Sequence, residues 1–471
     1  MRLHPNSGVT LLNLSIWIRR QGWLWIGYRR FPQSWRNRIS AIMVAHTLRS
    51  TKFKDLPIPT SSVRLAEASA SIDTIGASAY ATSAGVNIFA CLRGQFGLAE
   101  SARMYSLALL EAGYPVALND IDIDAPHVFD DRSLDDHIGT NAPYGINLIF
   151  VNPDYLAPAL ASINNAKMEG RYVIACWFWE LERIPDNWLW ALNHVDEIMV
   201  ASNFVEKAFR KVTDKPILRV PIPISCAGDS GLTRRQFGLA PNKFVFLNTF
   251  DFNSWWCRKN PFSVIKAFRN AFPTERRDVQ LLIKSINGHR QPEKLMHLVA
   301  CASVDDRIIV RDEVIDRRDM HALQRCTDAY ISLHRAEGFG LGLAECMAMG
   351  KPVVGTGWSG NLDYMTQDNS CLVNYRLVPV GDEEYPHSDG AMWAEADIEH
   401  ASALMKRIVD EPLFAQALGA KASEDTQKRL SPRAVAGIIA ARLDEIAMKR
   451  TLFSRVEETP MGGENATSTW S

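Results

Sequence analysis

The stretch Glu337-Gly338-Phe339-Gly340-Leu341-Gly342-Leu343-Ala344-Glu345 joins the apolar segment 328–333 to a second apolar segment that ends at Gly350-Lys351-Pro352. β-branched and aromatic residues predict a buried strand over 328–333. A helix is expected over 341–349, because Gly350 suits a left-handed C-cap and Pro352 stops a helix. This glycine turn between a strand and a helix predicts an α/β domain.

The same stretch carries the chemistry of an anion site. The first amides of a helix lack intrahelical acceptors, and the glycines allow an anion to approach the backbone closely. Glu345 lies about one turn into the helix and faces the same crevice as Glu337. A carboxylate accepts hydrogen bonds from a vicinal diol and repels phosphate. The pattern predicts a ligand with both a phosphate and a sugar, although a glutamate in a first helical turn often only complements the helix dipole.

The stretch from His334 to Glu345, continued by 350–354 and 359–365, resembles the signature of retaining glycosyltransferases of the GT-B fold. The family is glycosyltransferase family 4, or group 1, and includes bacterial surface-polysaccharide enzymes. The resemblance extends over about residues 86–445. It implies that Glu337 contacts the donor sugar and that Glu345 binds the ribose hydroxyls. It also implies that the diphosphate or the sugar meets the backbone of Gly338, Phe339, Gly340 and Leu341.

Length and composition fit a protein with two cores. The chain has 471 residues, and single cores stop growing at about 250 to 300 residues. A hydrophobic fraction of 47% with 22% charged residues is ordinary for a soluble globular protein, and a net charge of −1 gives no reason to expect a nucleic-acid partner. The eight cysteines are scattered without a Cys-x-x-Cys pair, which predicts reduced thiols and a cytoplasmic protein.

Strand and helix alternate along most of the chain, which predicts parallel sheets covered on both faces. Strands are expected near 86–92, 115–119, 147–151, 172–177, 197–201, 217–220, 243–248, 279–286, 307–310, 329–333, 352–355 and 370–374. Helices at 397–410 and 432–449 are expected to close the chain. The predicted fold is therefore α/β, with two Rossmann-like doubly wound domains that face a central cleft, as in GT-B enzymes.

The predicted organisation has six parts. A basic, aromatic extension at 1–60 and a linker at 61–85 precede an N-terminal acceptor domain at 86–222. A C-terminal nucleotide-sugar donor domain at 223–430 follows. A closing helix at 431–449 and a disordered tail at 450–471 complete the chain.

Two cations follow the first strand of the second domain. Arg258 and Lys259 lie in a loop at the carboxyl end of that strand, where ligands of α/β domains bind. They are predicted to stabilise the charge of a diphosphate leaving group. The family usually has an arginine about five residues before the lysine, where this chain has Ser254, so Arg258 is expected to take over that task.

Three further positions are candidates for the site. Lys284 lies late in an apolar strand, and a lysine there needs a partner. Gly97 ends the turn 94–97, which matches the first-domain loop that in the family approaches the donor phosphate or the acceptor. Glu180 stands where many family members place a histidine next to the sugar, and it is predicted to hydrogen-bond the acceptor or the sugar.

Some neighbouring residues have two interpretations. Trp177 and Trp179 either offer stacking faces to a saccharide or pack the domain. His334 is interpreted as a structural histidine. Asp120-Ile121-Asp122 resembles a manganese motif of another glycosyltransferase fold but is interpreted as polar alternation at a strand end. No metal site and no cofactor are predicted, apart from the nucleoside-diphosphate sugar as substrate.

Residues 1–60 are strongly basic and rich in tryptophan. They contain ten lysines and arginines against the single acid Asp55, with Trp17, Trp23, Trp25 and Trp35 interleaved. The apolar run 9–18 is too short to span a bilayer, and it lacks the cleavage site of a secretory signal. The segment is interpreted either as a membrane-surface element on the inner face of the plasma membrane or as a basic helix packed on the enzyme.

Together these features predict a retaining hexosyltransferase that acts on a saccharide or lipid-linked acceptor in surface polysaccharide synthesis. Two alternatives remain at this point: a sugar-nucleotide epimerase with the same fold and a non-catalytic scaffold that binds nucleotide sugars. The sequence does not identify the base, the sugar, the acceptor or the oligomeric state.

Overall fold

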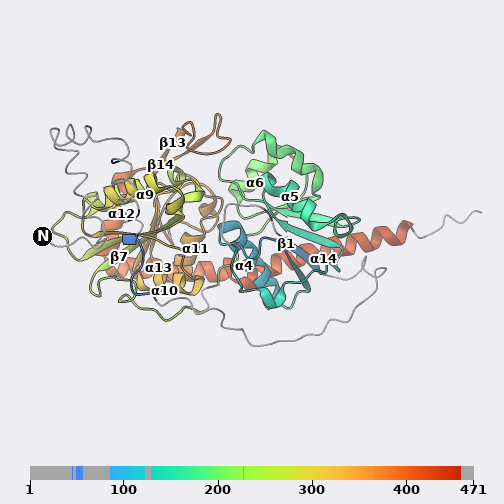
Figure 1. Cartoon of the computed structure of the whole chain (residues 1–471), viewed down its shortest axis with the longest axis horizontal. Helices are drawn as coiled ribbons and strands as arrows, with labels where there is room; N and C mark the ends of the chain where they lie inside the picture. The colour runs from blue at the N-terminus through green and yellow to red at the C-terminus, as the bar shows by residue number, and fades with distance from the viewer. Residues whose placement is uncertain are drawn as a thin grey trace, which may run out of the picture.

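The computed structural model describes residues 35, 45, 49–56, 85–121, 123, 129–225 and 228–457, with side chains up to Thr451. The chain forms two α/β domains that lie side by side (Figure 1). Most of the predicted extension, all but one residue of the predicted linker and most of the predicted tail lie outside the described residues. Among the described residues, no helix is long and apolar enough to cross a membrane.

The first domain contains a six-stranded parallel sheet with the order β2-β1-β3-β4-β5-β6. Every strand expected between residues 86 and 220 is present. The bounds are β1 Val86–Ala90, β2 Val116–Asp120, β3 Ile146–Phe150, β4 Tyr172–Cys176, β5 Glu197–Val200 and β6 Ile217–Arg219. Alternate residues of the strands point to opposite faces, and both faces are buried beneath helices.

Helices cover the two faces of this sheet. Helix α4 packs on one face, and α5, α6 and the 3-10 segment η3 pack on the other. Their bounds are α4 Gly97–Glu111, α5 Pro153–Ile163, η3 Asp186–His194 and α6 Asn203–Arg210. Ser202 caps α6, because its hydroxyl accepts a hydrogen bond from the amide of Val205.

The second domain repeats this plan with the order β12-β11-β10-β7-β8-β9. All strand pairs are parallel, and β7 and β10 are neighbours although the chain visits β8 and β9 between them. The bounds are β7 Phe244–Asp251, β8 Val279–Ile286, β9 Ile308–Asp312, β10 Ala329–Ser332, β11 Val353–Thr356 and β12 Cys371–Val373. The loops after β7 and β10 therefore meet at the carboxyl edge of the sheet, at a topological switch point.

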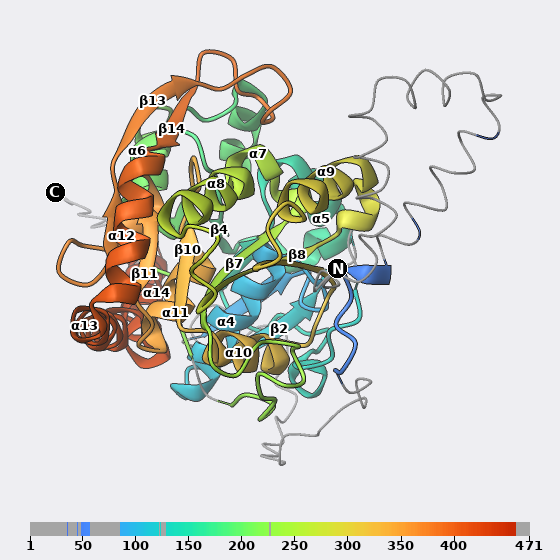
Figure 2. The ribbon, with the colours of Figure 1, turned by 90° about the vertical axis from the view of Figure 1, so that its left-hand side faces the viewer.

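The second sheet is also covered on both faces (Figure 2). Helices α8, α9 and α12 pack on one face, and α10 and α11 pack on the other. The bounds are α7 Trp256–Lys259, α8 Pro261–Ala271, α9 Pro292–Ala302, α10 Arg317–Cys326, α11 Leu341–Ala348 and α12 Ile398–Asp410. The helices expected at 341–349 and 397–410 are thus confirmed.

One helix and a two-stranded hairpin were not expected from the sequence. Helix α13, Pro412–Leu430, packs beside α11, and a Cβ at Gly419 would lie 2.1 Å from the carbonyl oxygen of Gly350. Strands β13, Tyr375–Pro379, and β14, Met392–Ala396, form an antiparallel hairpin outside the main sheet. Only glycine allows α13 to approach α11 so closely, so α13 supports the helix that carries Glu345.

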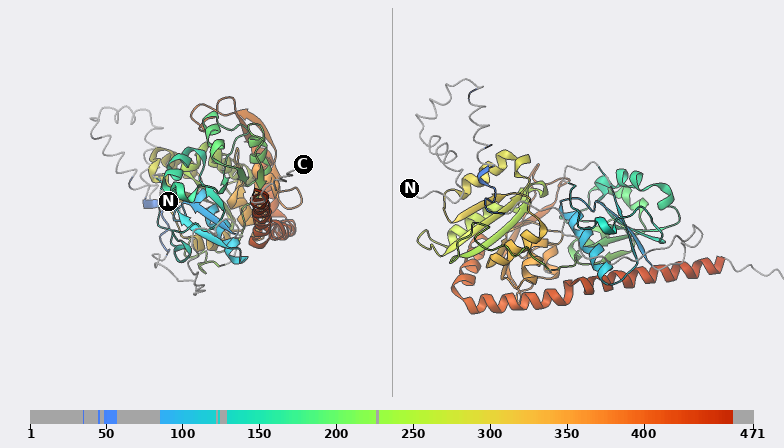
Figure 3. Two further views of the ribbon diagram at one scale, coloured as in Figure 1. Left: turned by 90° about the vertical axis from the view of Figure 1, so that its right-hand side faces the viewer. Right: turned by 60° about the horizontal axis from the view of Figure 1, so that its bottom comes forward.

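Helix α14, Pro432–Glu457, continues from α13, and the two helices together run beneath both domains (Figure 3, right). It is longer than the helix expected at 432–449. It packs on α4 of the first domain, where Tyr114 donates a hydrogen bond to Asp444 at 2.9 Å and Arg442 pairs with buried Glu197 at 2.8 Å. The helix thereby joins the two domains on the side away from their carboxyl edges.

A described piece of the predicted N-terminal extension packs on the second domain. The amide of Asp312, at the end of the edge strand β9, donates to the carbonyl of Thr51 at 2.9 Å. The amide of Phe53 donates to Glu313 at 2.9 Å, and the Phe53 ring lies 5.7 Å from Phe237. Residues 49–56 therefore pack on the second domain, although residues 51–56 do not form the basic helix that one interpretation expected.

The described cysteines are Cys91, Cys176, Cys257, Cys301, Cys326, Cys346 and Cys371, and all seven are free thiols. Four of them are buried, as expected for cysteines that act as small hydrophobic residues. Cys226 lies outside the described residues.

Candidate active site

Four predicted residues come together where the domains meet. Lys259 Nζ lies 2.6 Å from Glu337 Oε1, and Arg258 Nη1 lies 3.1 Å from Glu337 Oε2. Arg258 Nη2 lies 3.5 Å from Glu180 of the first domain. Arg258 also donates to the carbonyl of Ala336 at 2.7 Å. The two cations thus come from the short helix α7 that follows β7, where the sequence predicted a loop, and the loops after β10 and β4 each supply one carboxylate.

The cations control the charge of Glu337. Burial alone would raise the pKa of this carboxyl, but Lys259 and Arg258 outweigh burial and lower the pKa to about 2. Burial lowers the pKa of Lys259, although Glu337 opposes this. Glu337 is therefore ionised at neutral pH.

The glycine turn is built by close contacts. Gly340 adopts φ +91°, a left-handed conformation that a side chain would strain, and α11 begins directly after it. A Cβ at Gly338 would lie 2.9 Å from the carbonyl oxygen of Trp179 in the first domain. The hydroxyl of Ser202, also in the first domain, donates to the carbonyl of Gly338 at 2.6 Å. The turn is consequently part of the contact between the domains, and Phe339 and Leu341 lie within it.

Glu345 is a second buried carboxylate, one turn into α11. Gln324 donates to its Oε2 at 2.8 Å, and Arg317 Nη2 lies 3.3 Å from its Oε1. Both partners come from α10 and were not predicted from the sequence. Their positions on one face of a single helix could have been noticed, but no local motif connects α10 with α11. Glu345 therefore has different partners from Glu337.

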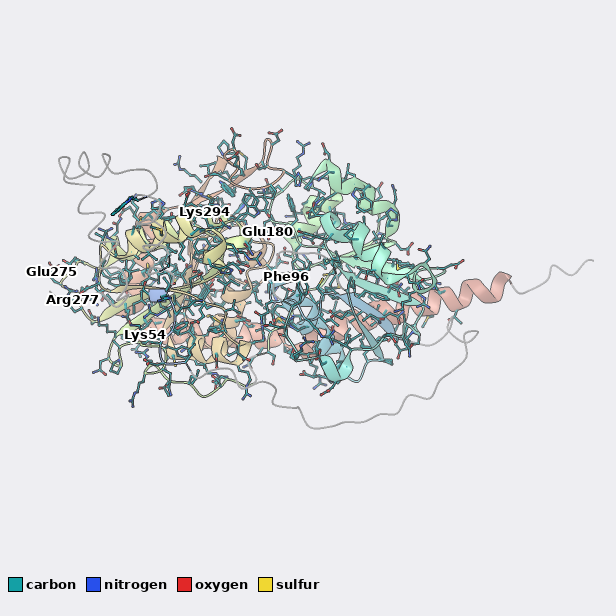
Figure 4. The ribbon with its side chains drawn as sticks, in the orientation of Figure 1. Lys54, Phe96, Glu180, Glu275, Arg277 and Lys294 are labelled. Carbon is teal, nitrogen blue, oxygen red and sulfur yellow. The ribbon has the colours of Figure 1, made fainter. Side chains whose placement is uncertain are left out.

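Glu180 contacts protein groups rather than lying free. Its Oε2 accepts a hydrogen bond from Tyr385, which lies in the loop of the β13–β14 hairpin. Glu180 lies at the boundary between the domains, as does Phe96 at the start of α4 (Figure 4). Glu180 is therefore shared between Tyr385 and Arg258, both from the second domain. Tyr385 was not predicted, because nothing in the sequence links the hairpin to residue 180.

The tryptophans after β4 pack the domain. Trp177 and Trp179 are both buried, and their indole N–H groups donate to the carbonyls of Val151 and Arg183 at 3.0 and 2.7 Å. Trp179 also contacts Trp188, with ring centroids 4.7 Å apart. The alternative of saccharide stacking is wrong for these two residues, since their faces are covered.

The remaining candidates lie outside this cluster. Lys284 is buried in β8, and burial lowers its pKa to about 8 against the attraction of Asp312 and Asp251. Gly97 is the first residue of α4, and a Cβ there would meet no atom within 4 Å. Lys284 thus has the acidic neighbours that a buried lysine needs. Position 97 has room for a side chain, so packing does not require glycine there.

His334 is structural. It is fully buried, its Nδ1 lies 3.1 Å from the Ser332 hydroxyl, and its Nε2 lies 3.1 Å from Asn361 Oδ1. Burial lowers the pKa of His334. A neutral ring that receives a hydrogen bond at Nδ1 and donates one at Nε2 fits these partners.

Asp120 ends β2 and pairs with Arg93 at 2.9 Å. Asp122 and Asp124 lie outside the described residues. Within the described part of the chain, no group of three histidine, cysteine or acidic side chains is placed to hold a metal ion.

The loop 251–260 has unused donors. Asn253 Nδ2, Arg258 Nε and Asn260 Nδ2 are buried and have no hydrogen-bond partner among the described residues. Buried donors without an acceptor are costly, at about 1 to 3 kcal/mol each. These atoms can serve a ligand rich in acceptor oxygens, such as a phosphate.

The electrostatics of Glu337 predict a specific acid sensitivity. Its pKa in the folded protein is about 2, below the ordinary value of 4.5, so its stabilising contribution is complete above pH 4.5 and is lost as the pH falls towards 2. Between pH 7 and pH 3 wild type should lose about 2 kcal/mol more unfolding free energy than Glu337→Gln. Chemical denaturation at both pH values measures this, with exposed Glu424→Gln as control. Equal losses in wild type and Glu337→Gln would contradict the assignment.

Comparison with known proteins finds a family match over most of the site. Residues 252–385, which begin directly after β7 and include the whole cluster except Glu180, match the family Glycosyl transferases group 1. Trehalose synthase of Pyrococcus horikoshii is 28% identical over 130 residues, or 26% of this chain and 30% of that protein. Trehalose synthase of Thermococcus litoralis is 27% identical over 133 residues, or 27% of this chain and 31% of that protein. The match thus spans less than a third of these curated relatives.

Solved structures extend the likeness to both domains. Anabaena HepE in complex with UDP and glucose has a TM-score of 0.56 at 14% identity, over 77% of this chain and 100% of that chain. Sucrose-phosphate synthase of Thermosynechococcus elongatus has a TM-score of 0.54 at 15% identity, over 79% of this chain and 100% of that chain. This chain therefore has the GT-B fold, and part of its second domain, residues 252–385, is similar to the family Glycosyl transferases group 1.

Proposed function

We propose that this protein is a retaining glycosyltransferase that transfers a hexosyl group from a nucleoside-diphosphate sugar to a hydroxyl acceptor. The observation that carries the proposal is the buried cluster of Arg258, Lys259 and Glu337 beside the start of α11. It combines cations for a diphosphate, a carboxylate for a sugar and the N-terminus of a helix for an anion. In this proposal the second carboxylate, Glu345, binds the ribose.

The charge balance of the cluster supports a role in leaving-group departure. Arg258 and Lys259 are matched by Glu337 and Glu180 before any ligand binds. A diphosphate that gains charge as the glycosidic bond breaks attracts these cations more strongly than the intact donor does. Preorganised donors aimed at developing charge are worth about 3 to 4 kcal/mol each. Positioning and electrostatics then carry the reaction, and Glu337 orients the sugar while the acceptor attacks from the same face.

The donor base and the acceptor are proposed more broadly. HepE, which shares the fold, was solved with UDP, so UDP is the first nucleotide to test. The acceptor is proposed to be a saccharide or lipid-linked saccharide of a surface polysaccharide. Release of free nucleoside diphosphate with transfer of the sugar distinguishes this reaction from epimerisation and from binding alone.

The two glutamates are expected to respond differently to substitution. Glu345→Gln should weaken binding of the nucleoside diphosphate by about 1 to 3 kcal/mol, because a ribose hydroxyl loses a charged acceptor. Glu337→Gln should mainly lower turnover. Calorimetric titration with UDP, GDP, ADP and dTDP, together with initial rates, separates the two effects. Unchanged affinity of Glu345→Gln for every nucleotide would exclude the ribose assignment.

Activity is expected to be independent of a metal ion. Arg258, Lys259 and the amides at the start of α11 supply the positive charge that a cation would otherwise provide. Dialysis against EDTA should therefore leave the rate of transfer unchanged. Complete loss with recovery on adding manganese would contradict this and would return attention to Asp120 and Asp122.

We also propose that the N-terminal extension holds the enzyme at the inner face of the plasma membrane. A truncation for this test should begin at Arg49, because Thr51 and Phe53 pack on the second domain. Full-length protein should sediment with anionic liposomes at low salt, and the truncated protein should not, since each basic residue contributes about 1 kcal/mol at an anionic surface. Nucleotide affinity serves as the control and should be equal. Absence of sedimentation of the full-length protein would end the membrane proposal.

A further inference from the structure

Three residues of α10 point at one carboxylate. Arg317, His321 and Gln324 are spaced so that they lie on the same face of the helix. Gln324 and Arg317 contact the two oxygens of Glu345 at 2.8 and 3.3 Å, and His321 Nε2 lies 4.0 Å from Oε1. Glu345 and Gln324 are buried, so this carboxylate depends on its protein partners rather than on water.

Arg317 also reaches the other domain. Its Nη1 forms an ion pair with Glu100 Oε1, in the first turn of α4. The second oxygen of Glu100 lies 2.5 Å from Arg103. Arg103 donates in turn to the carbonyls of Leu92 and Gly94 at 2.8 and 2.7 Å, in the loop that follows β1. A continuous line of charged contacts therefore runs from the first-domain loop to Glu345.

The guanidinium of Arg317 contacts two carboxylates that belong to different domains. Arg317 uses separate nitrogens for Glu100 and Glu345, which a planar guanidinium permits and an ammonium does not. A change in the charge or position of either carboxylate therefore alters the contact that Arg317 makes with the other. This is the physical requirement for energetic coupling between two sites.

We propose that Arg317 is a positioning residue that orients Glu345 for the ribose and couples nucleotide binding to the contact between the two domains through Glu100. The inference rests on the proposed function and adds a residue of the first domain to the control of donor affinity. Binding of a diol to Glu345 and closure of the domains onto α4 then strengthen one another by the same factor, because such coupling is reciprocal.

The experiment compares Glu100→Gln, Arg317→Gln and the double variant. The probe is the nucleoside diphosphate among UDP, GDP, ADP and dTDP that binds wild type most tightly. Glu100→Gln and Arg317→Gln should each weaken binding about 5- to 20-fold, within the usual range of coupling energies. The double variant should bind like Arg317→Gln, because the effect of Glu100 passes through Arg317. Arg317→Lys should recover part of the affinity.

A matched control and a second readout separate coupling from stability. Glu111→Gln changes an exposed residue at the end of the same helix α4 and should leave affinity unchanged. Thermal unfolding without nucleotide reports whether a variant is simply less stable. Small-angle scattering should show that the nucleotide makes wild type more compact and that the change is smaller in Glu100→Gln.

The outcomes distinguish this inference from the proposed function. If wild type binds no nucleoside diphosphate, the proposed function fails. If wild type binds one and Glu100→Gln binds it equally tightly, the coupling is absent and Arg317 only joins the domains structurally. Affinity losses that add in the double variant would mean that Glu100 acts on the nucleotide directly, which also overturns the inference.

Discussion

A buried carboxylate cannot remain ionised without partners, and Glu337 is ionised because Arg258 and Lys259 hold it from both sides. The two cations and the carboxylate lie in different loops, so the loops must be fixed relative to each other. The pairing of β7 with β10 provides this, because neighbouring parallel strands deliver their following loops to the same point. The backbone bond from the amide of Arg335 to the carbonyl of Arg258, at 2.8 Å, completes the connection.

The need to pair these buried charges also explains how the first domain contacts the cluster. Arg258 has more donors than Glu337 can accept, and its second amino nitrogen faces Glu180 across the domain boundary. Glu180 in turn accepts a hydrogen bond from the hydroxyl of Tyr385, which belongs to the second domain. The charged cluster is therefore closed only when the domains are together. In the proposed function, a donor that redirects Arg258 towards its diphosphate would also change the partners of Glu180, and this would link charge in the site to the position of the hairpin.

Much of this arrangement could be predicted from the sequence, because its signals are local. Apolar runs predicted the bounds of the strands to within a few residues. Gly340 and the two glutamates predicted the turn before α11. Helix α13 was missed because Gly419 packs against a partner that lies far away in the sequence. Tyr385 and Arg317 were missed for the same reason: each matters through a contact made in space, with Glu180 or Glu100, that no spacing along the chain reveals.

Glu337 and Glu345 have identical side chains but different partners, and the partners give the two carboxylates different properties. Glu337 forms ion pairs with two cations of its own domain, so its charge and position are determined before a ligand binds. That suits a group which must meet a reacting sugar without reorganising. Glu345 is held by an amide and by a guanidinium shared with Glu100. An amide and a shared cation compete less strongly for a carboxylate than two dedicated cations do, which fits the proposal that Glu345 accepts from a diol. The partners, rather than the carboxylates themselves, therefore distinguish the group proposed for chemistry from the one proposed for binding.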